Sequence, residues 1–499
     1  MTTIEFLCSN WEPNSLVCKQ KGRFSCKNCL LVNYCGSECQ KSDWVQHKSE
    51  CRSPLGKATW QPCWVRENRI PSFMGGGIGQ VFGSKKYLWG NMPAFDVLEL
   101  ESNEGIGFKA DLRLLFAASG DIRNVVKTIA QIPSNYNHAL HVTINDRDSE
   151  IVVRNVILLL IALVVEDPDE AVECIIHVWY STLVRKSDID LLQIRIRPLI
   201  EAVCEKVKDK RSNTILVKTW SFGQRSLRVA LDKASWARLL SSLDIPEGLT
   251  MDRAREIRAA IVMAESRKDY RARELVCQSP SHRLALHKFR QDGLLLPFGT
   301  PRRDFLEPNP TFFQSDKTWP MKDNADPRHG WSSKEVAETS SGPAAADIYG
   351  KLFYHVRLTL QSFLSRLDTM YLCFEVFQLD VLDLPKHLKS KTFSRIEVSN
   401  VADAGWLGIH DTLASMIPLL QDTLDNPHAT LITLFMNAVD ETLTDEDRRR
   451  DLTINSTSTK RLLRYLPPSG APPSQYDPRI IKFNLARDLV TTYDNIFDR

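Results

Sequence analysis

The chain has 499 residues, of which 43% are hydrophobic and 25% are charged, a composition that predicts a folded protein of two or three domains. Its formal net charge of +3 at pH 7 is too small to indicate a nucleic-acid-binding protein or a protein held at an acidic membrane surface. The longest apolar run, residues 156–165, is about half as long as a membrane span, so we expect a buried helix there and no membrane partner.

Cysteine is concentrated at the start of the chain. Seven of the 12 cysteines lie within the first 51 residues, and a histidine lies four positions before the last of these seven. Thiolate sulfur and imidazole nitrogen are preferred ligands of zinc, and two tetrahedral ions need eight of them. The segment therefore predicts two zinc ions per chain, held by Cys8, Cys18, Cys26, Cys29, Cys35, Cys39, His47 and Cys51.

A secreted domain stapled by disulfides is the alternative for such a segment. Residues 1–7 are too few and too polar for a signal peptide, and an odd number of cysteines would leave one unpaired. These observations favour zinc and an intracellular protein, either cytoplasmic or nuclear. The apolar residues of the segment are too few to fold it alone, so we expect metal binding and folding to be one event. They are Phe24, Leu30, Leu31, Val32, Tyr34, Trp44 and Val45.

The spacing from Tyr34 to Cys51 resembles the second half of a MYND zinc finger, which we place at residues 8–51. At the position where this family usually has a cysteine three residues before the second ligand, this chain has Ser15, so Cys8 must reach across a longer loop. The resemblance implies two interleaved sites. They are Cys8, Cys18, Cys35 and Cys39 for one ion, and Cys26, Cys29, His47 and Cys51 for the other.

The resemblance to MYND fingers also implies a kind of partner. Such fingers typically bind proline-containing peptides or partner proteins, and by resemblance Gln40 and Trp44 would lie in the peptide groove. Trp44 could equally be a packing residue on the last short helix of the finger.

Residues 52–88 are expected to form a linker that packs onto the following domain. Pro54, Gly56, Pro62 and Pro71 interrupt any long helix. The aromatic residues Trp60, Trp64 and Phe73 offer apolar anchors. The glycine-rich run 75–79 does not follow an apolar strand, so it predicts a flexible turn and not a dinucleotide-binding loop.

Residues 89–165 predict a strand, a helix, a second strand and a second helix. The strands are expected at 111–118 and 141–144, and the helices at 122–132 and 147–165. This order is typical of a βαβ unit, whose parallel strands lie in a sheet covered on both faces. Ligands of such sheets bind at the carboxyl ends of the strands, which makes Gly120 and Asp146 candidate contacts.

The remaining chain is expected to complete this α/β domain after an interruption. Residues 166–346 show helical spacing with many charged residues and predict a helical insertion. Residues 347–445 then return to a helix at 348–367 and strands at 371–379, 394–401 and 429–436. Residues 446–499 are expected to form a tail with a proline-rich loop at 467–478 and a last helix near 480–497.

Three motifs of the α/β part resemble a domain of unknown function shared by dynein axonemal assembly factor 3 and a group of fungal MYND proteins. They are Trp89-Gly90-Asn91-x-Pro93-Ala94-x-Asp96, Ser119-Gly120-Asp121-Ile122-Arg123-Asn124 and Asn145-Asp146-Arg147-Asp148. More remotely, the strand order is similar to Rossmann-like, three-layer class I S-adenosylmethionine methyltransferases. That similarity implies cofactor contacts at Gly120, Asp146 and either Asp380 or Asp383.

The methyltransferase resemblance has a clear departure. The first strand-to-helix turn has one glycine where these enzymes have two or three, and the bulky Ile122 stands in the path of the cofactor. We identify no catalytic base or nucleophile.

Two hypotheses of function follow. The first is a zinc-dependent interaction protein whose finger recruits a protein partner and whose α/β body is a scaffold or assembly factor. The alternative is an S-adenosylmethionine-dependent methyltransferase whose finger selects the substrate. The sequence favours the first, and it leaves the oligomeric state open.

Overall fold

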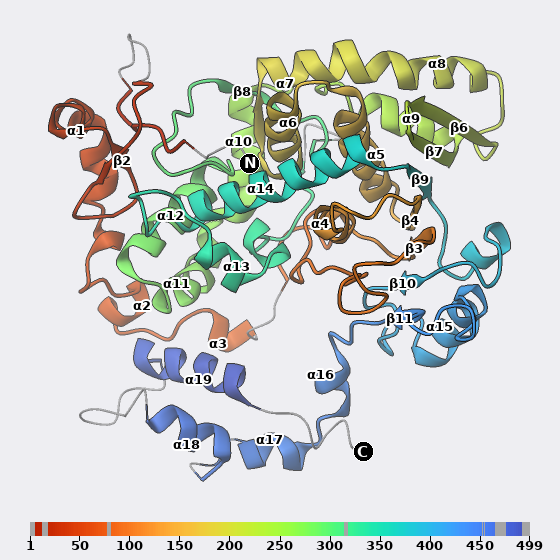
Figure 1. Ribbon diagram of the computed structural model, residues 1–499. Helices are drawn as coiled ribbons and strands as arrows, with labels where there is room; N and C mark the ends of the chain where they lie inside the picture. Colours follow the sequence, from red (N-terminus) through yellow and green to blue (C-terminus); the bar gives the residue numbers. More distant parts are fainter. Residues whose placement is uncertain are drawn as a thin grey trace.

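The computed structural model describes residues 5–11, 18–76, 81–313, 318–451, 453, 455–464 and 476–491 (Figure 1). Ser15, residues 77–79 of the expected glycine-rich turn, residues 467–475 of the expected proline-rich loop and residues 492–497 of the expected last helix lie outside this description. Gly75 and Gly76 end the short helix α3 (Phe73–Gly76).

The amino-terminal finger consists of a two-stranded hairpin and one helix. Strands β1 (Phe24–Ser25) and β2 (Asn33–Tyr34) pair antiparallel, and α1 (Ser37–Cys51) follows. The buried residues of α1 are Asp43, His47 and Cys51, which are four residues apart and form one inward stripe. That stripe is polar, so the helix has no apolar face with which to hold its place.

The apolar core of the finger is smaller than the sequence predicts. Leu31 and Tyr34 are buried, but Phe24 is 60% exposed and Val45 is 84% exposed. Only part of the few apolar residues of the finger therefore lies in its core.

Residues 52–88 pack against two distant parts of the chain. This segment holds the turn η1 (Pro54–Gly56), α2 (Cys63–Arg66) and α3. Trp64 and Phe73 meet edge to face and form a buried cluster with Ala272 of α11 (Lys268–Val276) and Ile481 of α19 (Pro478–Val490). Figure 1 shows α19 beneath α2 and α3, so the carboxyl-terminal helix helps to hold this segment.

The body is built on a seven-stranded mixed sheet with the order β11-β10-β3-β4-β9-β7-β6. All neighbours are parallel except β6 and β7. The strands are β3 (Leu112–Phe116), β4 (Leu140–Asn145), β6 (Ile215–Phe222), β7 (Arg225–Asp232), β9 (Leu372–Phe377), β10 (Arg395–Glu397) and β11 (Thr430–Ile432). The five strands predicted from the sequence are all present.

One face of the sheet carries the main core. Helices α5 (Ser149–Val164) and α9 (Lys233–Ser241) contact the strands. Helix α14 (Ile348–Thr369) packs against α4 (Arg123–Gln131) and α6 (Pro168–Tyr180), and α6 packs against α5. In α5, 12 of 16 residues are buried, which fits the apolar run at 156–165. Asp148 begins α5 by accepting a hydrogen bond from the amide of Glu150.

The other face is covered over only part of its width, which corrects the expectation of helices on both faces. A row of directly paired residues on this face runs from Leu115 through Thr143, Glu375 and Arg228 to Thr219. Leu115 packs in a cluster with Met416 of α15 (Ile409–Met416), whereas Glu375 and Arg228 are half-buried and Thr219 is exposed. The connection from β9 to β10 contains only the 3-10 turn η5 (Leu384–His387), so it supplies no helix to cover the open part.

The segment 166–346 is not purely helical, which corrects a second expectation. Strands β6 and β7 lie within it and add a hairpin to the main sheet, while β5 (Leu183–Arg185) pairs with β8 (Phe305–Pro308). Gly223 has φ +63° at the first position of the two-residue hairpin loop, as a type II′ turn requires. Period-two alternation in 215–232 around this glycine was the available signal.

The remaining elements surround this framework. The helix α7 (Lys186–Leu191) continues through a π-helical turn, η2 (Leu192–Ile196), into α8 (Arg197–Val207). Others are α10 (Met251–Val262), η3 (Glu265–Arg267), α12 (Pro280–Asp292), η4 (Pro327–Gly330), α13 (Ser333–Glu338), η6 (Ile417–Leu419), α16 (Ala438–Thr442), α17 (Asp445–Asp451) and α18 (Thr457–Leu463). Within the described ranges, no helix combines the length and apolar character that crossing a membrane would need.

Candidate metal centres

The first group of candidate ligands lies at the centre of the finger. Cys26 and Cys29 lie between β1 and β2, while His47 and Cys51 lie one turn apart on α1, and all four are buried. The Sγ atoms of Cys26 and Cys51 are 3.7 Å apart. The Sγ atom of Cys29 is 3.4 Å from Nε2 of His47. A tetrahedral zinc ion with Zn–S of about 2.3 Å and Zn–N of about 2.0 Å requires separations of about 3.8 Å and about 3.5 Å, so this group fits zinc.

The second group joins the start of the chain to the start of α1. The Sγ atom of Cys18 lies 3.9 Å from those of Cys35 and Cys39, which are 3.4 Å from each other. Cys8 completes the group, with all four sulfurs within 4.8 Å of one another. Cys8 is positioned by its backbone, because its amide donates to the carbonyl of Gln20 over 2.9 Å. This hydrogen bond joins the segment that carries Cys8 to the segment that follows Cys18.

None of these sulfurs is in a disulfide. The S–S separations of 3.4–3.9 Å far exceed the bond length of about 2.05 Å, and every cysteine is free. Both groups therefore have the ligand types and spacing of zinc centres. Since Cys39 lies in the first turn of α1 and Cys51 at its end, one helix connects the two centres.

The surroundings of the ligands favour a bound cation. Burial raises the pKa of the Cys8 thiol and of the Cys51 thiol, because a thiolate in a low-dielectric site is costly without a compensating positive charge. A zinc ion supplies that charge and binds the thiolate form. Asn28 adds an outer contact, since its Nδ2 donates to Sγ of Cys51 over 3.2 Å.

Comparison with known families agrees with this geometry. Residues 16–51 match the sequence model of the MYND finger. This segment is a MYND finger. Residues 88–184 match a second family, described as a domain of unknown function, DUF4470. No solved structure matches the chain. The two Cys/His groups fit two zinc ions in the MYND finger, and Cys8 lies outside the matched stretch.

The MYND finger is docked against the body. Its Leu30 carbonyl accepts from the amide of Ala346 over 3.1 Å, and Glu50 pairs with Lys288 of α12 over 2.7 Å. Gly299 lies so close that a Cβ there would be 2.0 Å from Oγ of Ser9. The finger at the left of Figure 1 therefore has one face fixed to the body.

Gln40 and Trp44 lie one helical turn apart on α1, and both are half-buried. The Trp44 ring meets the ring of His47 nearly edge-on, with centroids 6.1 Å apart, and the guanidinium of Arg52 lies 5.3 Å from its centroid. Trp44 is thus partly packed against a metal ligand and partly open to solvent.

The candidate cofactor contacts of the body are engaged within the protein. Asp146 accepts from the amide of Gly120 over 3.0 Å and from the amide of Asp148 over 2.9 Å. Gly120 has φ +56°, which suits its place in the turn after β3. Asp383 is exposed and pairs with Lys386, and Asp380 accepts from the amide of Leu382. The structure thus brings Gly120 and Asp146 together, whereas Asp383 bonds within its own turn.

The segment that begins at Trp89 is hydrogen-bonded to the residues around Asp121 at the start of α4. Asp121 accepts from the amide of Gly90 over 2.8 Å and pairs with Arg123 over 2.6 Å. Arg123 also donates to the carbonyl of Met92, and Trp89 donates to the carbonyl of Trp179. These three side chains therefore connect residues 89–92 to the start of α4 and to the end of α6.

Sequence reasoning missed a buried acid at the carboxyl end of β10. Glu397 is 1% exposed, and its Oε2 has no hydrogen-bond partner in the described part of the chain. Burial raises the pKa of Glu397 to about 7, although an amide hydrogen bond from Ser399 and the charge of Arg123 oppose the shift. A charged residue inside the otherwise apolar run 396–398 was the only signal in the sequence.

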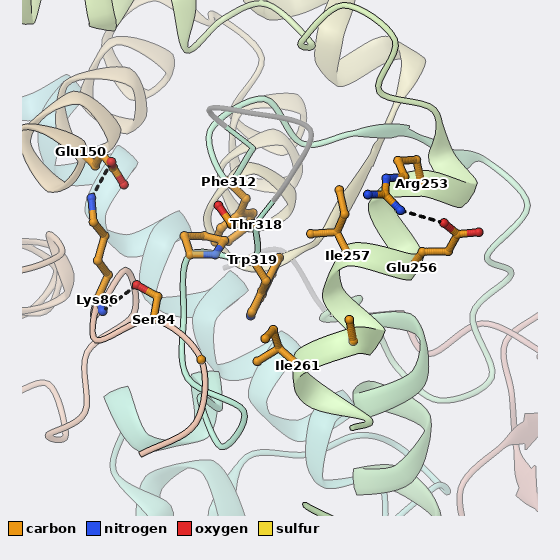
Figure 2. Close-up of a pocket in the computed structure, with 13 residues that line it drawn as sticks. Ser84, Lys86, Glu150, Arg253, Glu256, Ile257, Ile261, Phe312, Thr318 and Trp319 are labelled. Carbon is orange, nitrogen blue, oxygen red and sulfur yellow. Dashed lines mark hydrogen bonds and ion pairs between the residues drawn. The ribbon is translucent and has the colours of Figure 1, made fainter. Parts of the chain in front are cut away.

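One cavity of the described structure adjoins a candidate zinc ligand, Cys8, and a second lies away from both metal centres. The first, of about 570 Å³, lies between the finger and the body. The other, of about 530 Å³, lies beside α10, where Ile257, Ile261 and Trp319 supply an apolar wall. Figure 2 shows two separate ion pairs on opposite sides of the second cavity, Lys86 with Glu150 and Arg253 with Glu256.

Proposed function

We propose that this chain is a zinc-dependent interaction protein, in which the finger recruits a protein partner and the α/β body is a scaffold or assembly factor. The observation that carries this proposal is the pair of four-ligand groups at the spacing of tetrahedral zinc. In the proposal, Cys8, Cys18, Cys35 and Cys39 hold one ion, and Cys26, Cys29, His47 and Cys51 hold the other.

The proposed partner carries a proline-containing peptide that binds beside Gln40 and Trp44. The open part of the Trp44 ring supports this placement, because an aromatic face is a suitable surface for proline. The adjoining Val45, 84% exposed, would extend the apolar contact. We place this interaction inside the cell, in the cytoplasm or nucleus, where thiols stay reduced.

Metal analysis together with peptide binding tests the proposal. Purified protein should contain two zinc ions per chain, and Cys8→Ser should reduce this number to one. A fluorescein-labelled peptide of alternating proline and leucine should bind the zinc-loaded protein. Trp44→Ala should weaken that binding at least fivefold without zinc loss, since it removes the aromatic surface. One zinc ion in the unaltered protein, or unchanged binding by Trp44→Ala, would contradict the assignment.

We further propose that the body is a Rossmann-like domain, made of residues 89–165 and 347–445. Numbered along the chain, the five strands β3, β4, β9, β10 and β11 have the order 3-2-1-4-5, which supports a doubly wound arrangement. The residues between these two parts and the tail from 446 would then be additions to that domain. The resemblance of its motifs to the assembly-factor domain is the reason for proposing an assembly role.

The same strand order favours a second candidate function, an S-adenosylmethionine-dependent methyltransferase. Against it, Asp146 already accepts two amide hydrogen bonds. Titration with S-adenosylmethionine in a calorimeter distinguishes the two functions. Saturable binding that weakens in Asp146→Ala would favour the methyltransferase, and absence of heat would favour the scaffold.

A further inference from the structure

The cleft between the finger and the body is a composite site. Its finger wall includes Leu31 and Asn33, and its body walls come from α6, α14 and the loop at 296–301. The cleft has a volume of about 570 Å³, which is sufficient for one or two amino-acid side chains of a bound segment. Neither wall is complete without the other, so the site depends on the docked arrangement.

The charge of the cleft is unbalanced. Five carboxylates and two guanidinium groups line it. Arg357 is paired with Asp169 over 2.8 Å and Arg185 with Glu173 over 2.9 Å, so these pairs also occupy two of the carboxylates. Three carboxylates then remain without a matching cation among the lining residues. The Asp169 and Asp304 side chains are 59% and 67% exposed, and Asp304 lies 3.8 Å from Arg303, which does not line the cleft. The cleft therefore favours a positively charged ligand.

Asn33 provides an independent indication of a ligand. It is 8% exposed, and its Nδ2 donates to the carbonyl of Ser341 over 3.4 Å. Its Oδ1 has no partner in the described part of the chain, although it is buried in the wall of the cleft. An unsatisfied buried acceptor is costly, and a donor from a bound molecule would remove that cost.

The floor of the cleft is apolar. Leu31, Phe305 and Phe353 line it and are all buried. An acidic rim over an apolar floor fits a chain segment that carries a basic side chain next to an aliphatic one. A free inorganic cation would leave the apolar floor unused.

We propose that this cleft binds an extended segment of a partner protein through an arginine or lysine side chain flanked by aliphatic residues. The basic group meets Asp169 and Asp304 at the rim, and a donor of the segment reaches Oδ1 of Asn33. This site is separate from the proposed groove at Gln40 and Trp44, so it does not rest on the proline-peptide assignment. A partner would contact the finger and the body at once.

The test uses the full-length, zinc-loaded protein and a fluorescein-labelled pentapeptide of alternating leucine and arginine. Anisotropy should show saturable binding that weakens with added salt. The same peptide with citrulline, a neutral side chain of similar shape, should bind at least fivefold more weakly. In Asp169→Asn/Asp304→Asn, the arginine peptide should lose affinity by about fivefold, because each rim pair contributes about 0.5 kcal/mol.

A matched control variant removes the same number of negative charges as the aspartate variant, at positions outside the cleft. Glu201→Gln/Glu205→Gln on α8 removes two carboxylates that are 59% and 73% exposed and do not line the cleft, so affinity should be unchanged. Urea unfolding verifies that the body of each variant is folded, and zinc content verifies the finger. Equal binding of the citrulline peptide, unchanged affinity in the aspartate variant, or no saturable binding at all overturns the proposal. Loss of binding in Trp44→Ala with full binding in the aspartate variant would also overturn it, because the peptide would then occupy the other groove.

Discussion

Helices α1 and α5 have nearly equal lengths but are held in place by different forces. α1 has 15 residues, and its buried positions are Asp43, His47 and Cys51. α5 has 16 residues, of which 12 are buried, most of them aliphatic. Burial of aliphatic side chains positions α5, whereas α1 must be positioned by whatever binds its cysteines and histidine. The finger and the body should therefore respond differently to metal, mutation and pH.

The largest effect should come from removing the metal. Each structural zinc site contributes on the order of 10 kcal/mol to folding in isolated fingers. Chelation should unfold the finger and leave the sheet intact. Hydrogen exchange should show loss of protection in residues 37–51 and retained protection in residues 140–145. Equal loss in both regions would show that the body depends on the finger, and unchanged protection of α1 would show that the metal does not position it.

The next effect should come from the body core. Leu159 is fully buried in α5, and Leu159→Ala removes its apolar contacts and leaves a cavity, at a cost of about 2–5 kcal/mol in the free energy of unfolding. Urea unfolding measures this loss. Zinc content should stay at two ions per chain. Val45→Ala on α1 is the control, because its side chain is exposed and the substitution should change stability by less than about 0.5 kcal/mol.

A pH-dependent effect should follow from Glu397. Its pKa is raised to about 7 in the folded protein from an ordinary 4.5, so the folded state retains a proton that the unfolded chain has released. Stability should therefore fall as pH rises from about 5 to about 8, and the loss should be complete above the folded pKa. Glu397→Gln should remove this decline. The comparison requires free energies of unfolding at pH 5 and pH 8, and an equal decline in both proteins would refute the assignment.

The smallest effect should come from the ion pair between the finger and the body. Glu50 is 41% exposed and Lys288 is 19% exposed. Such partly exposed pairs contribute about 0–1 kcal/mol. Glu50→Gln should therefore lower the stability of the docked finger only slightly, as measured by hydrogen exchange in α1. A loss as large as that in Leu159→Ala would mean that this pair is a main contact of the finger.

The finger was the more predictable region because its organisation is local. The eight ligands lie within 51 residues, and their spacing predicts two zinc ions. The resemblance to MYND fingers implies the two groups that the structure brings together. The sequence did not show that one side of the finger is fixed to the body, because contacts such as Leu30 with Ala346 join residues far apart in the chain.

The body was predictable in its elements but not in their arrangement. Apolar runs predicted β3, β4 and β9, yet the sheet places β7 beside β9, which nothing in the local pattern indicates. The hairpin of β6 and β7 was missed because its alternating residues include charged ones and lie among helices. Buried polar pairs such as Arg395 with Glu104, 2.9 Å apart, also depend on distant partners.

Strand β6 has consequences for how the protein behaves at high concentration. It is the eight-residue outermost strand of the sheet, and Ile215 and Val217 are exposed along it. An edge strand of this kind leaves backbone N–H and C=O groups unpaired, and these groups can pair with a strand of another chain. Lys218 lies in the middle of this strand, where its charge disfavours stacking of identical chains. A neutral aliphatic residue at that position would remove the main deterrent to aggregation along this edge.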